Sequence, residues 1–552
     1  MAMGNIGLSL LFVLHLSFCT EFIYIKYDIH TDLYFIETEK PPADWIAYAN
    51  FSNEINSTGW SYLEVTTNPA YPDFAQAYSA GLAEGYITRQ LIAMHWNNTV
   101  QGYCDPESPS DYCKRLADYV KQNLAWVNDK INKPDNSPED KVYWHQVDLF
   151  LKQVSGLQDG YENKPAHPSI NLDPFQFLMF QIAGDIEDLE EALHKPDKSR
   201  ALGSGSCSAL VKLLPGNKDL YVSHDTWSSF QSMLRILKKY DFGYKIQQDS
   251  GPLIPGKVMT FSSYPGVIYS GDDYYLISSG LVSQETTIGN NNDKLWKYVK
   301  PTYSVLEGIR TMVANRLATS IDTWAQIFSR YNSGTYNNQW MIVDYTKFKP
   351  GQTPSAGLFG VVEQIPNMVK YADMTRVLTA QSYWPSYNIP YFQEVFEASG
   401  WIKMVEKYGD WFSYNKTARA NIFRRDHVKV KDINSMIALM RYNDYQHDPL
   451  SRCNCTPPYS AENAISARCD LNPANGSYPI KALGHRSHGG TDMKLTNSEM
   501  FKSLQFVAIS GPTFDSLPPF QWSKTDFEKI YPHVGHPDLW QFKPVVHQWK
   551  LT

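Results

Sequence analysis

The sequence predicts an α+β protein in which helices cover a layered body of β-sheet. Amphipathic helical patterns recur over residues 110–193 and again over 303–331, while β-branched and aromatic runs broken by Gly and Asp-Asp lie between and after them. Helices that flank sheet in this way fit a layered α+β body, because each buries its apolar stripe against the sheet. The sequence contains no internal repeat and no heptad run, so we expect one mixed body.

The strongest helical pattern covers residues 110–132, where Ser110 or Asp111 is available as an N-cap. Its apolar and aromatic residues recur near helical spacing: Tyr112, Leu116, Tyr119, Leu124, Val127 and Ile131. Similar patterns predict helices over residues 143–157 and 175–193, and a long pair over residues 303–331. Strands are predicted over residues 258–287 and 340–345.

The composition limits the classes of function. Of the 552 residues, 43% are hydrophobic and 19% are charged, which is typical of a globular chain and disfavours disorder. A formal net charge of −7 disfavours nucleic acid as an electrostatically held partner. Aromatic residues make up 14% of the chain, which suits a large, partly polar interior or a ligand groove.

The N-terminus carries a targeting pattern. Residues 6–14 form an apolar run of the length of a signal-peptide core, followed by the small or polar residues Ser17, Cys19 and Thr20. We therefore predict a signal peptide over residues 1–20. No other stretch of about 18 apolar residues occurs, so we expect no stable membrane insertion. Six glycosylation sequons fit passage through the secretory pathway: Asn50, Asn56, Asn97, Asn415, Asn454 and Asn475.

Cysteine spacing predicts two disulfides in an oxidising compartment. Cys104 and Cys113 are close enough to close a small loop. The cluster of Cys453, Cys455 and Cys469 can hold one disulfide and leaves one thiol, and the sequence alone does not decide which. Our working assignment pairs Cys455 with Cys469.

Cys207 stands apart from the other cysteines, directly before an apolar run, a Pro-Gly-Asn-Lys turn and a second apolar run. This pattern predicts a β-hairpin. If Leu214 lies opposite Asp219, then Ala209 faces His224, and Cys207 lies diagonal to His224 on the same face, with Cβ atoms roughly 7–8 Å apart. A shift of one residue would move His224 to the other face. The alternative interpretation is a buried structural thiol and a half-buried histidine with satisfied hydrogen bonds.

The stretch "GSGSCS" at residues 203–208 gives this thiol a chemical use. A thiol after a sharp, flexible turn can attack the carbonyl of Ser206, move the acyl group to sulfur and let water hydrolyse the thioester. Cys207 would then be a new N-terminus whose α-amine serves as the base for its own sulfur. The sequence therefore predicts self-cleavage between Ser206 and Cys207, unless this stretch is only a surface loop.

Six longer segments extend the pattern: "CSALVKLLPGNKDLYVSHDTW" (207–227), "VMTFSSYPGVIYSGDDYYLISSGLVSQETTIGN" (258–290), "YWPSYNIPYFQEVFEASG" (383–400), "YGDWFSYNKTARANIFRRD" (408–426), "MRYNDYQHDPLS" (440–451) and "AENAISARCDLNPANGSYP" (461–479). Together they resemble the phospholipase B-like proteins, a family of N-terminal nucleophile hydrolases. The resemblance runs from about residue 40 to the C-terminus. It implies a four-layer αββα sandwich, a precursor that cleaves itself before the cysteine, and a secreted or lysosomal glycoprotein.

The same resemblance implies a domain organisation and an activity. Cleavage would leave an N-terminal fragment, 21–206, and a C-terminal catalytic fragment, 207–552, associated non-covalently in one intertwined domain. The family's assigned activity is hydrolysis of acyl ester bonds of phospholipids, whereas its fold relatives are mostly amidases. We therefore expect a lipid or an N-acyl small molecule as substrate, with an amidase or acylase, or a non-catalytic lipid-binding glycoprotein, as the alternatives.

Site residues follow from the resemblance position by position. The nucleophile falls on Cys207 and the neighbouring imidazole on His224, with Trp227 lining the substrate region. A pocket threonine that binds substrate falls on Thr286 or Thr287, and we favour Thr286.

The remaining two catalytic positions fall on Asn388, as the oxyanion donor, and on Arg419, as the pocket cation. An amide N–H aimed at an oxyanion contributes about 2.7–4 kcal/mol in a dry site. By composition alone, Asn388 could be a turn residue before Ile389-Pro390, and Arg419 could be a solvated charge.

Other chemistries find weaker support. No G-x-S-x-G motif is present, and the surroundings of Cys207 lack the second cysteine and the tryptophan of a papain-like site. His485, His488 and Asp492 offer a weak zinc pattern, because a single loop cannot supply a closed site. We expect neither a cofactor nor a metal.

Overall fold

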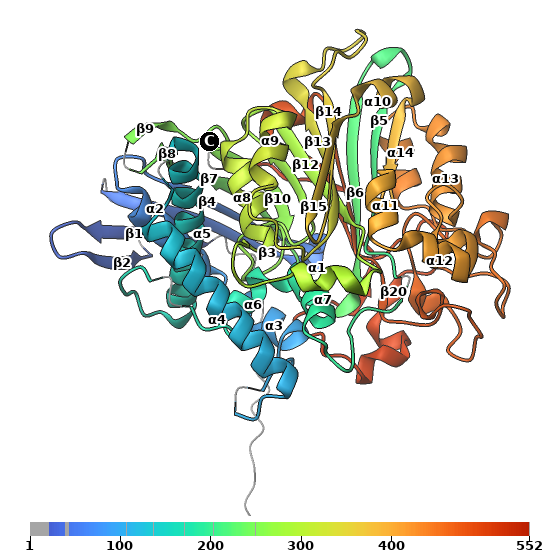
Figure 1. Cartoon of the computed structure of the whole chain (residues 1–552), viewed down its shortest axis with the longest axis horizontal. Coiled ribbons are helices and arrows are strands. Elements are labelled where there is room, and N and C mark those ends of the chain that lie inside the picture. Colours follow the sequence, from blue (N-terminus) through green and yellow to red (C-terminus); the bar gives the residue numbers. More distant parts are fainter. Residues whose placement is uncertain are drawn as a thin grey trace, which may run out of the picture.

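The computed structural model describes residues 21–38, 44–105, 107–135, 137–169, 172–202, 204–248 and 250–550. The predicted signal peptide lies outside these residues. Two β-sheets form the centre of the molecule, and helices cover the outer face of each sheet (Figure 1). The predicted α+β class is confirmed, and the described residues form helix, sheet, sheet and helix layers.

The larger sheet has eleven strands among the described residues, in the order β15-β14-β13-β12-β11-β10-β7-β4-β3-β1-β2. Their bounds are β1 Glu21–Asp28, β2 Leu33–Glu37, β3 Trp45–Glu54, β4 Trp60–Thr67, β7 Ile236–Asp241, β10 Val258–Ser263, β11 Tyr274–Ile277, β12 Leu281–Thr287, β13 Asn338–Asp344, β14 Phe359–Ile365 and β15 Met368–Asp373. The predicted strands over residues 258–287 and 340–345 are β10 to β13.

Strand β4 joins the two halves of this sheet. It pairs in parallel with β7, so that Ser61 lies opposite Ile236 and Thr66 opposite Asp241. Strands β1 to β4 precede the Ser206–Cys207 bond, whereas β7 and the other strands of the sheet follow it. Chain segments on both sides of this bond therefore share one hydrogen-bonded sheet.

The smaller sheet follows the order β16-β5-β6-β18-β19-β22, with β17 paired to β6. Its strands are β5 Cys207–Leu213, β6 Leu220–Ser229, β16 Tyr383–Ser386, β17 His488–Gly490, β18 Asp492–Thr496, β19 Val507–Ser510 and β22 Val545–Val546. Two short pairs complete the strands: β8 Lys245–Gln247 with β9 Ser250–Leu253, and β20 Phe520–Gln521 with β21 Leu539–Trp540.

The predicted hairpin is confirmed in its register. Strands β5 and β6 are antiparallel, with Ala209 opposite His224 and Cys207 opposite Thr226. The backbone N–H of Leu214 donates to the carbonyl of Asp219 at 2.9 Å, which closes the turn. Cys207 and His224 are therefore diagonal neighbours on one face, as the alternation of side chains along the strands requires.

Helices cover the outer face of the larger sheet: α2 Asp73–Ile87, α3 Arg89–Thr99, α4 Asp111–Asn132, α5 Pro138–Glu162, α6 Phe177–Gln181, α7 Ala183–Ala192, α8 Glu307–Leu317 and α9 Ile321–Phe328, with the short α1 Ile55–Thr58 between β3 and β4. The helix predicted over residues 110–132 is α4, and the Ser110 hydroxyl caps it by accepting from the N–H of Cys113. The helix predicted over residues 175–193 is divided into α6 and α7 at Ile182.

A second set of helices covers the smaller sheet: α10 Thr375–Gln381, α11 Gln393–Ala398, α12 Trp401–Tyr408, α13 Ala418–Asp426 and α14 Ile433–Met440. Apolar residues of β5 and β6 alternate between two cores. Ala209 and Val211 pack against the larger sheet, whereas Leu210 and Tyr221 pack beneath α13 and α14. This alternation places Cys207 on the face toward the larger sheet.

The disulfide assignment needs one correction. Cys104 and Cys113 are bonded as predicted. Cys453 is bonded to Cys455, so the pairing of Cys455 with Cys469 is wrong. Cys469 is a buried free thiol whose Sγ lies 2.6 Å from Glu462 Oε2, and it packs in a cluster with Trp227 and Ala467 that includes neither Cys453 nor Cys455.

The glycosylation sequons differ in exposure. Four asparagines are exposed and Asn97 is half-buried; the exposed ones are Asn56, Asn415, Asn454 and Asn475. Asn50 is 5% exposed, and its Nδ2 donates to Glu64 Oε1 at 3.2 Å. A glycan on this nitrogen would displace a buried hydrogen bond, so we withdraw Asn50 from the candidates.

Helices α2 and α5 approach each other closely at four glycines. A Cβ added at Gly156 would lie 2.0 Å from the Tyr78 carbonyl oxygen, and one added at Gly81 would lie 1.9 Å from that of Gln153. Gly85 and Gly160 repeat this contact one turn further along. The backbones can pack this closely only because these positions carry no side chain.

We expect Gly156→Ala to lower the melting temperature, since the added methyl group forces α2 and α5 apart at a cost of about 1–3 kcal/mol in the free energy of unfolding. Thermal melts followed by circular dichroism measure the effect, with Lys121→Ala on the exposed face of α4 as the control. Equal melting temperatures for Gly156→Ala and the wild type would contradict this account of the packing.

Candidate active site

Cys207 begins β5, and its buried side chain faces the gap between the two sheets. The residue is 5% exposed. Burial raises the pKa of the thiol well above its usual range, and the charge of Glu285 on β12 raises it further, while Lys494 acts in the opposite direction. The sulfur is therefore protonated in the uncut chain, and it needs a base before it can act as a nucleophile.

Hydrogen bonds hold the peptide groups on both sides of the Ser206–Cys207 bond. The carbonyl oxygen of Ser206 accepts from the N–H of Trp227 at 2.6 Å. The N–H groups of Ser206 and Cys207 both donate to Asn388 Oδ1, at 3.1 and 3.4 Å. Arg419 Nη1 donates to the carbonyl oxygen of Cys207 at 2.5 Å. The bond predicted to break is thus fixed in orientation.

Asn388 meets the Ser206–Cys207 peptide as a hydrogen-bond acceptor in the uncut chain, and its part as an oxyanion donor stays a prediction. Its Nδ2 donates to the Thr287 carbonyl at 2.8 Å, which orients Oδ1 toward the scissile peptide. The residue adopts a positive φ of 69° in the left-handed region, which asparagine tolerates. In the uncut chain Asn388 therefore offers an acceptor for N–H groups, and the donor to the Ser206 carbonyl is the Trp227 N–H.

Thr286 supports Asn388. Its Oγ1 accepts from the Asn388 backbone N–H at 3.3 Å and lies 2.7 Å from Ser386 Oγ. The Ser386 hydroxyl in turn donates to Gln339 Oε1 at 2.6 Å. Thr286 is fully buried by these contacts, so in this state it positions Asn388.

Trp227 and Arg419 pack together beside the scissile peptide. The guanidinium carbon of Arg419 lies 4.4 Å from the centroid of the Trp227 ring, and the Trp227 indole donates to the Ile465 carbonyl at 3.2 Å. Burial lowers the pKa of Arg419 to about 10, so the group stays charged at neutral pH. The structure thus brings Arg419 to the Cys207 carbonyl and Trp227 to the Ser206 carbonyl, while their roles toward a substrate stay predictions.

His224 lies on the expected face but forms its hydrogen bonds elsewhere. Its Nε2 donates to the Glu285 carbonyl at 2.9 Å, and its Nδ1 lies 3.4 Å from Thr226 Oγ1. Burial pushes the pKa of His224 well below its usual range, and Lys494 pushes it further, so the imidazole is neutral. His224 on β6 thus links the smaller sheet to the larger one through its hydrogen bond to β12, close to the thiol.

A buried ionic cluster lies behind Thr226, and the sequence analysis missed it. Lys494 Nζ donates to Thr226 Oγ1 at 2.6 Å and to Asp492 Oδ1 at 2.9 Å. Asp492 also binds Arg235 at 2.8 Å. Burial alone would raise the pKa of Asp492. The positive charges of Lys494 and Arg235 outweigh this effect and lower the pKa to about 2. The sequence signal for this cluster was the alternation of the charged Asp492 and Lys494 with the apolar Met493 and Leu495.

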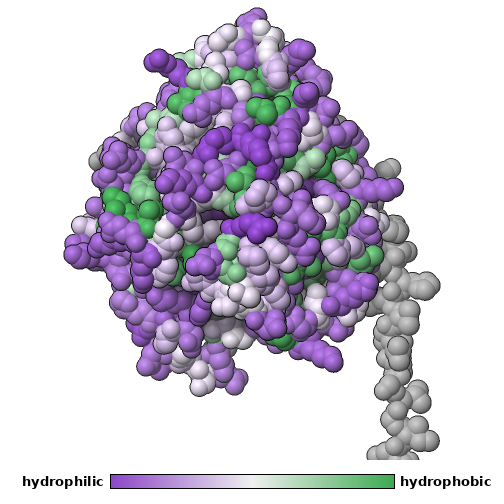
Figure 2. All heavy atoms as spheres, turned by 90° about the vertical axis from the view of Figure 1, so that its right-hand side faces the viewer, coloured by the Kyte–Doolittle hydropathy of each residue, from purple (hydrophilic) through white to green (hydrophobic). Residues whose placement is uncertain are grey.

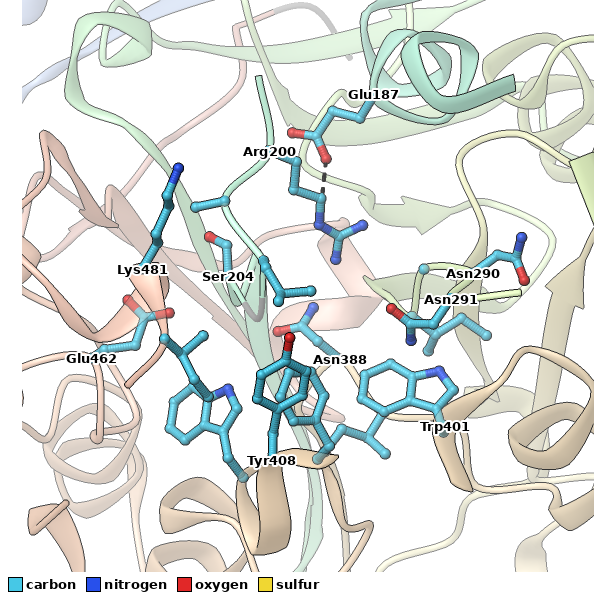
Figure 3. Close-up of a pocket in the computed structure, with 18 of the residues that line it drawn as sticks. Glu187, Arg200, Ser204, Asn290, Asn291, Asn388, Trp401, Tyr408, Glu462 and Lys481 are labelled. Atoms are coloured by element: carbon cyan, nitrogen blue, oxygen red, sulfur yellow. Dashed lines mark ion pairs between the residues drawn. The ribbon is translucent and has the colours of Figure 1, made fainter. Parts of the chain in front are cut away.

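A cavity of about 760 Å³ lies next to these residues, and Asn388 and Arg419 are part of its lining. Aromatic and aliphatic side chains form part of its lining: Ile389, Trp401, Tyr408, Trp411, Phe412 and Ile480. In Figure 3 Glu187 and Arg200 lie at the top of the view, opposite Trp401 and Tyr408, while Lys481 and Glu462 lie at the left. Residues of the segment before the scissile bond, including Ser204, also line the cavity.

The surface that carries α12 and α13 is largely hydrophilic. In Figure 2 the apolar residues of this face form separate spots among polar ones, with a hollow near the centre. Among the described residues, no helix combines the length and apolar character needed to cross a bilayer.

The weak zinc pattern is not assembled. His485 binds Asp526 at 3.0 Å and the Asn472 carbonyl at 2.6 Å, while Asp492 is occupied by Lys494 and Arg235. Instead, Glu462, Cys469 and His488 bring possible ligand atoms within 4.8 Å of one another. Arg486 donates to Glu462 at 2.9 Å, and a guanidinium in this position opposes a second cation.

The family described as Phospholipase B matches residues 47–547 of the chain. Phospholipase B-like 2 of Rattus norvegicus is 54% identical over 512 residues, covering 92% of this chain and 87% of the relative. Phospholipase B-like 2 of Homo sapiens is 52% identical over 512 residues, covering 92% of this chain and 86% of the relative. Phospholipase B-like 1 of Caenorhabditis elegans is 47% identical over 539 residues, covering 95% of this chain and 91% of the relative. The resemblance noted in the sequence is confirmed, and the chain belongs to the phospholipase B family.

Proposed function

We propose that this chain is the precursor of a self-cleaving cysteine hydrolase that breaks acyl bonds, with the ester bonds of phospholipids as its substrates. The observation that carries the proposal is the held peptide bond next to Cys207. Its carbonyl accepts from Trp227 N–H, and its N–H is bound by Asn388. A carbonyl polarised by a fixed donor beside a thiol is the arrangement that acyl transfer to sulfur requires.

In the self-cleavage step, Cys207 Sγ attacks the carbonyl carbon of Ser206. The C–N bond to Cys207 breaks, the departing nitrogen takes the proton that leaves the thiol, and the Ser206 acyl group is joined to sulfur as a thioester. Water then hydrolyses the thioester, which releases the Ser206 carboxylic acid and restores the thiol. Cys207 is left with a free α-amine, which Asn388 Oδ1 is placed to bind.

The mature enzyme would repeat both halves of this chemistry, acyl transfer to sulfur and thioester hydrolysis, on its substrate. The α-amine of Cys207 accepts the thiol proton, the sulfur attacks the substrate's acyl carbon, and the leaving alcohol takes the proton back. Hydrolysis of the acyl-thioester releases the acid. The Trp227 N–H is the donor available to the developing oxyanion, and Arg419 keeps the Cys207 carbonyl in place.

The cavity supports an amphipathic substrate. Its aromatic and aliphatic side chains can contact an acyl chain, and the cationic Arg200 and Lys481 can contact a polar headgroup. Because the neighbouring surface carries only separate apolar spots, a lipid would have to enter the cavity to react. An amide substrate is the second candidate, since the bond that the site already holds is a peptide bond.

The localisation proposed is the secretory pathway, as a secreted or lysosomal glycoprotein. The exposed sequons and the Cys104–Cys113 disulfide support it. Buried carboxyls support an acidic compartment. Burial raises the pKa of Asp188 to about 7 and that of Asp185 to about 6, and also raises the pKa values of Asp273 and Glu285. Such groups stabilise the fold best when they are protonated.

Cys207→Ala should leave the secreted protein as one uncut polypeptide without hydrolase activity, because the attacking sulfur is gone. The wild type should give two fragments, and N-terminal sequencing of the larger one should begin at Cys207. Denaturing gel electrophoresis and peptide sequencing measure both outcomes.

Fluorogenic phospholipid esters and N-acyl amides offered to the mature wild type decide between ester and amide. A wild type that stays uncut yet hydrolyses either substrate would refute the proposed mechanism. A protein that binds lipid equally well with and without Cys207, and hydrolyses neither substrate, would be a carrier.

The pH dependence of stability can be checked at Asp188. Between about pH 4 and pH 7 the unfolded chain loses the carboxyl proton while the folded one keeps it, so this group lowers the free energy of unfolding by about 1.4 kcal/mol per pH unit. Asp188→Asn lacks this slope. Its melting temperature relative to the wild type should therefore rise between about pH 4.5 and pH 7.5. The exposed Asp197→Asn is the control, and a constant difference for Asp188→Asn would contradict the raised pKa.

A further inference from the structure

A second group of contacts holds the chain just before the scissile bond. The N–H of Gly205 donates to Glu462 Oε1 at 3.1 Å, and Arg486 Nη1 donates to Ser204 Oγ at 3.0 Å. Glu462 and Arg486 are themselves paired at 2.9 Å. These two residues lie more than 250 positions further along the chain, and neither contacts Cys207 in the described hydrogen bonds.

Both carboxylate oxygens of Glu462 are used. Oε2 accepts from Arg486 Nη2 and from the Cys469 thiol, at 2.9 and 2.6 Å. Oε1 is left for the Gly205 N–H. The Glu462 side chain is fully buried, so the carboxylate has a fixed position and a strong preference for an N–H donor at this point.

On its other side, Gly205 rests against the Trp227–Arg419 pair. A Cβ added at Gly205 would lie 2.7 Å from Trp227 Cζ3 and 2.9 Å from Arg419 Nη2. The absence of a side chain lets the backbone pass between this surface and Glu462. Ser204, Gly205 and Ser206 are small, so the Ser204 hydroxyl and the Gly205 N–H provide the anchoring that a large side chain would otherwise provide.

We propose that Glu462 and Arg486 are positioning residues for self-cleavage. They hold Ser204 and Gly205 against Trp227, which keeps the Ser206 carbonyl on the Trp227 N–H and in front of the Cys207 sulfur. They exchange no proton and form no bond in the step, in which the thioester forms and the C–N bond breaks as described above. This inference rests on the proposed self-cleavage.

Glu462→Gln tests the positioning role in the full-length chain. A glutamine keeps the size but has one acceptor oxygen, so either Gly205 or Arg486 loses its partner. We expect the cleavage rate to fall at least about tenfold, equivalent to about 1.4 kcal/mol. Pulse-labelled secreted protein, resolved on denaturing gels over time, gives the rate of conversion from precursor to fragments.

Asp470→Asn is the matched control. Asp470 is a buried carboxylate in the same loop that pairs with Arg468 and does not contact Ser204, Gly205 or Ser206. Its loss should leave the cleavage rate unchanged. Melting temperatures of both variants in a Cys207→Ala background, where no cleavage occurs, separate loss of stability from loss of positioning.

Ser204→Ala gives a second, milder measurement, because it removes the acceptor of Arg486 Nη1 without altering the pair between Arg486 Nη2 and Glu462. It decides the matter if the Glu462→Gln chain is not secreted, and slower cleavage is again expected. Wild-type cleavage rates in Glu462→Gln, or in Ser204→Ala when it is the deciding variant, would overturn the inference while leaving self-cleavage intact. An uncut wild type would instead overturn the proposed function.

Discussion

The antiparallel register of β5 and β6 is the constraint on which the site depends. Cys207 lies opposite Thr226 in this register, so the next residue on β6, Trp227, lies opposite Ser206, which precedes β5. The Trp227 N–H therefore donates to the Ser206 carbonyl. The same pairing puts His224 and the thiol on one face. A shift of one residue would turn the sulfur toward α13 and α14 and remove the donor from the scissile carbonyl. Hairpin geometry thus places both the proposed nucleophile and the peptide bond that it is proposed to attack.

Along this hairpin the side chains between the two sheets are apolar at one end and charged at the other. Ala209 and Val211 pack in an ordinary core, whereas the charges of Lys494 and of Glu285 on β12 act on the Cys207 thiol. Burying charges costs free energy unless each has a partner, and Asp492 has two cationic partners. The buried ionic groups are therefore coupled to one another and to Thr226, which makes this end of the β5–β6 pair rigid.

Local chemistry in the sequence was enough to predict the hairpin, its register, the Cys104–Cys113 bond and the helix that Ser110 caps. These features depend on residues close together in the chain. The pairing of β4 with β7, the cluster around Lys494 and the Glu462–Arg486 pair depend on contacts between distant segments, which spacing does not reveal. The acceptor role of Asn388 escaped prediction because the orientation of its amide is set by the Thr287 carbonyl, which no motif encodes.

The parallel pairing of β4 with β7 has a consequence for folding and refolding. In the uncut chain both halves are tethered, so bringing these strands together during folding is an intramolecular event. Under the proposed cleavage, the native body would be held by its shared hydrogen bonds, and renaturation would be a second-order encounter between two incomplete pieces. The lifetime of the cleaved protein would then be governed by its rate of unfolding, since an unfolded molecule would have little prospect of refolding.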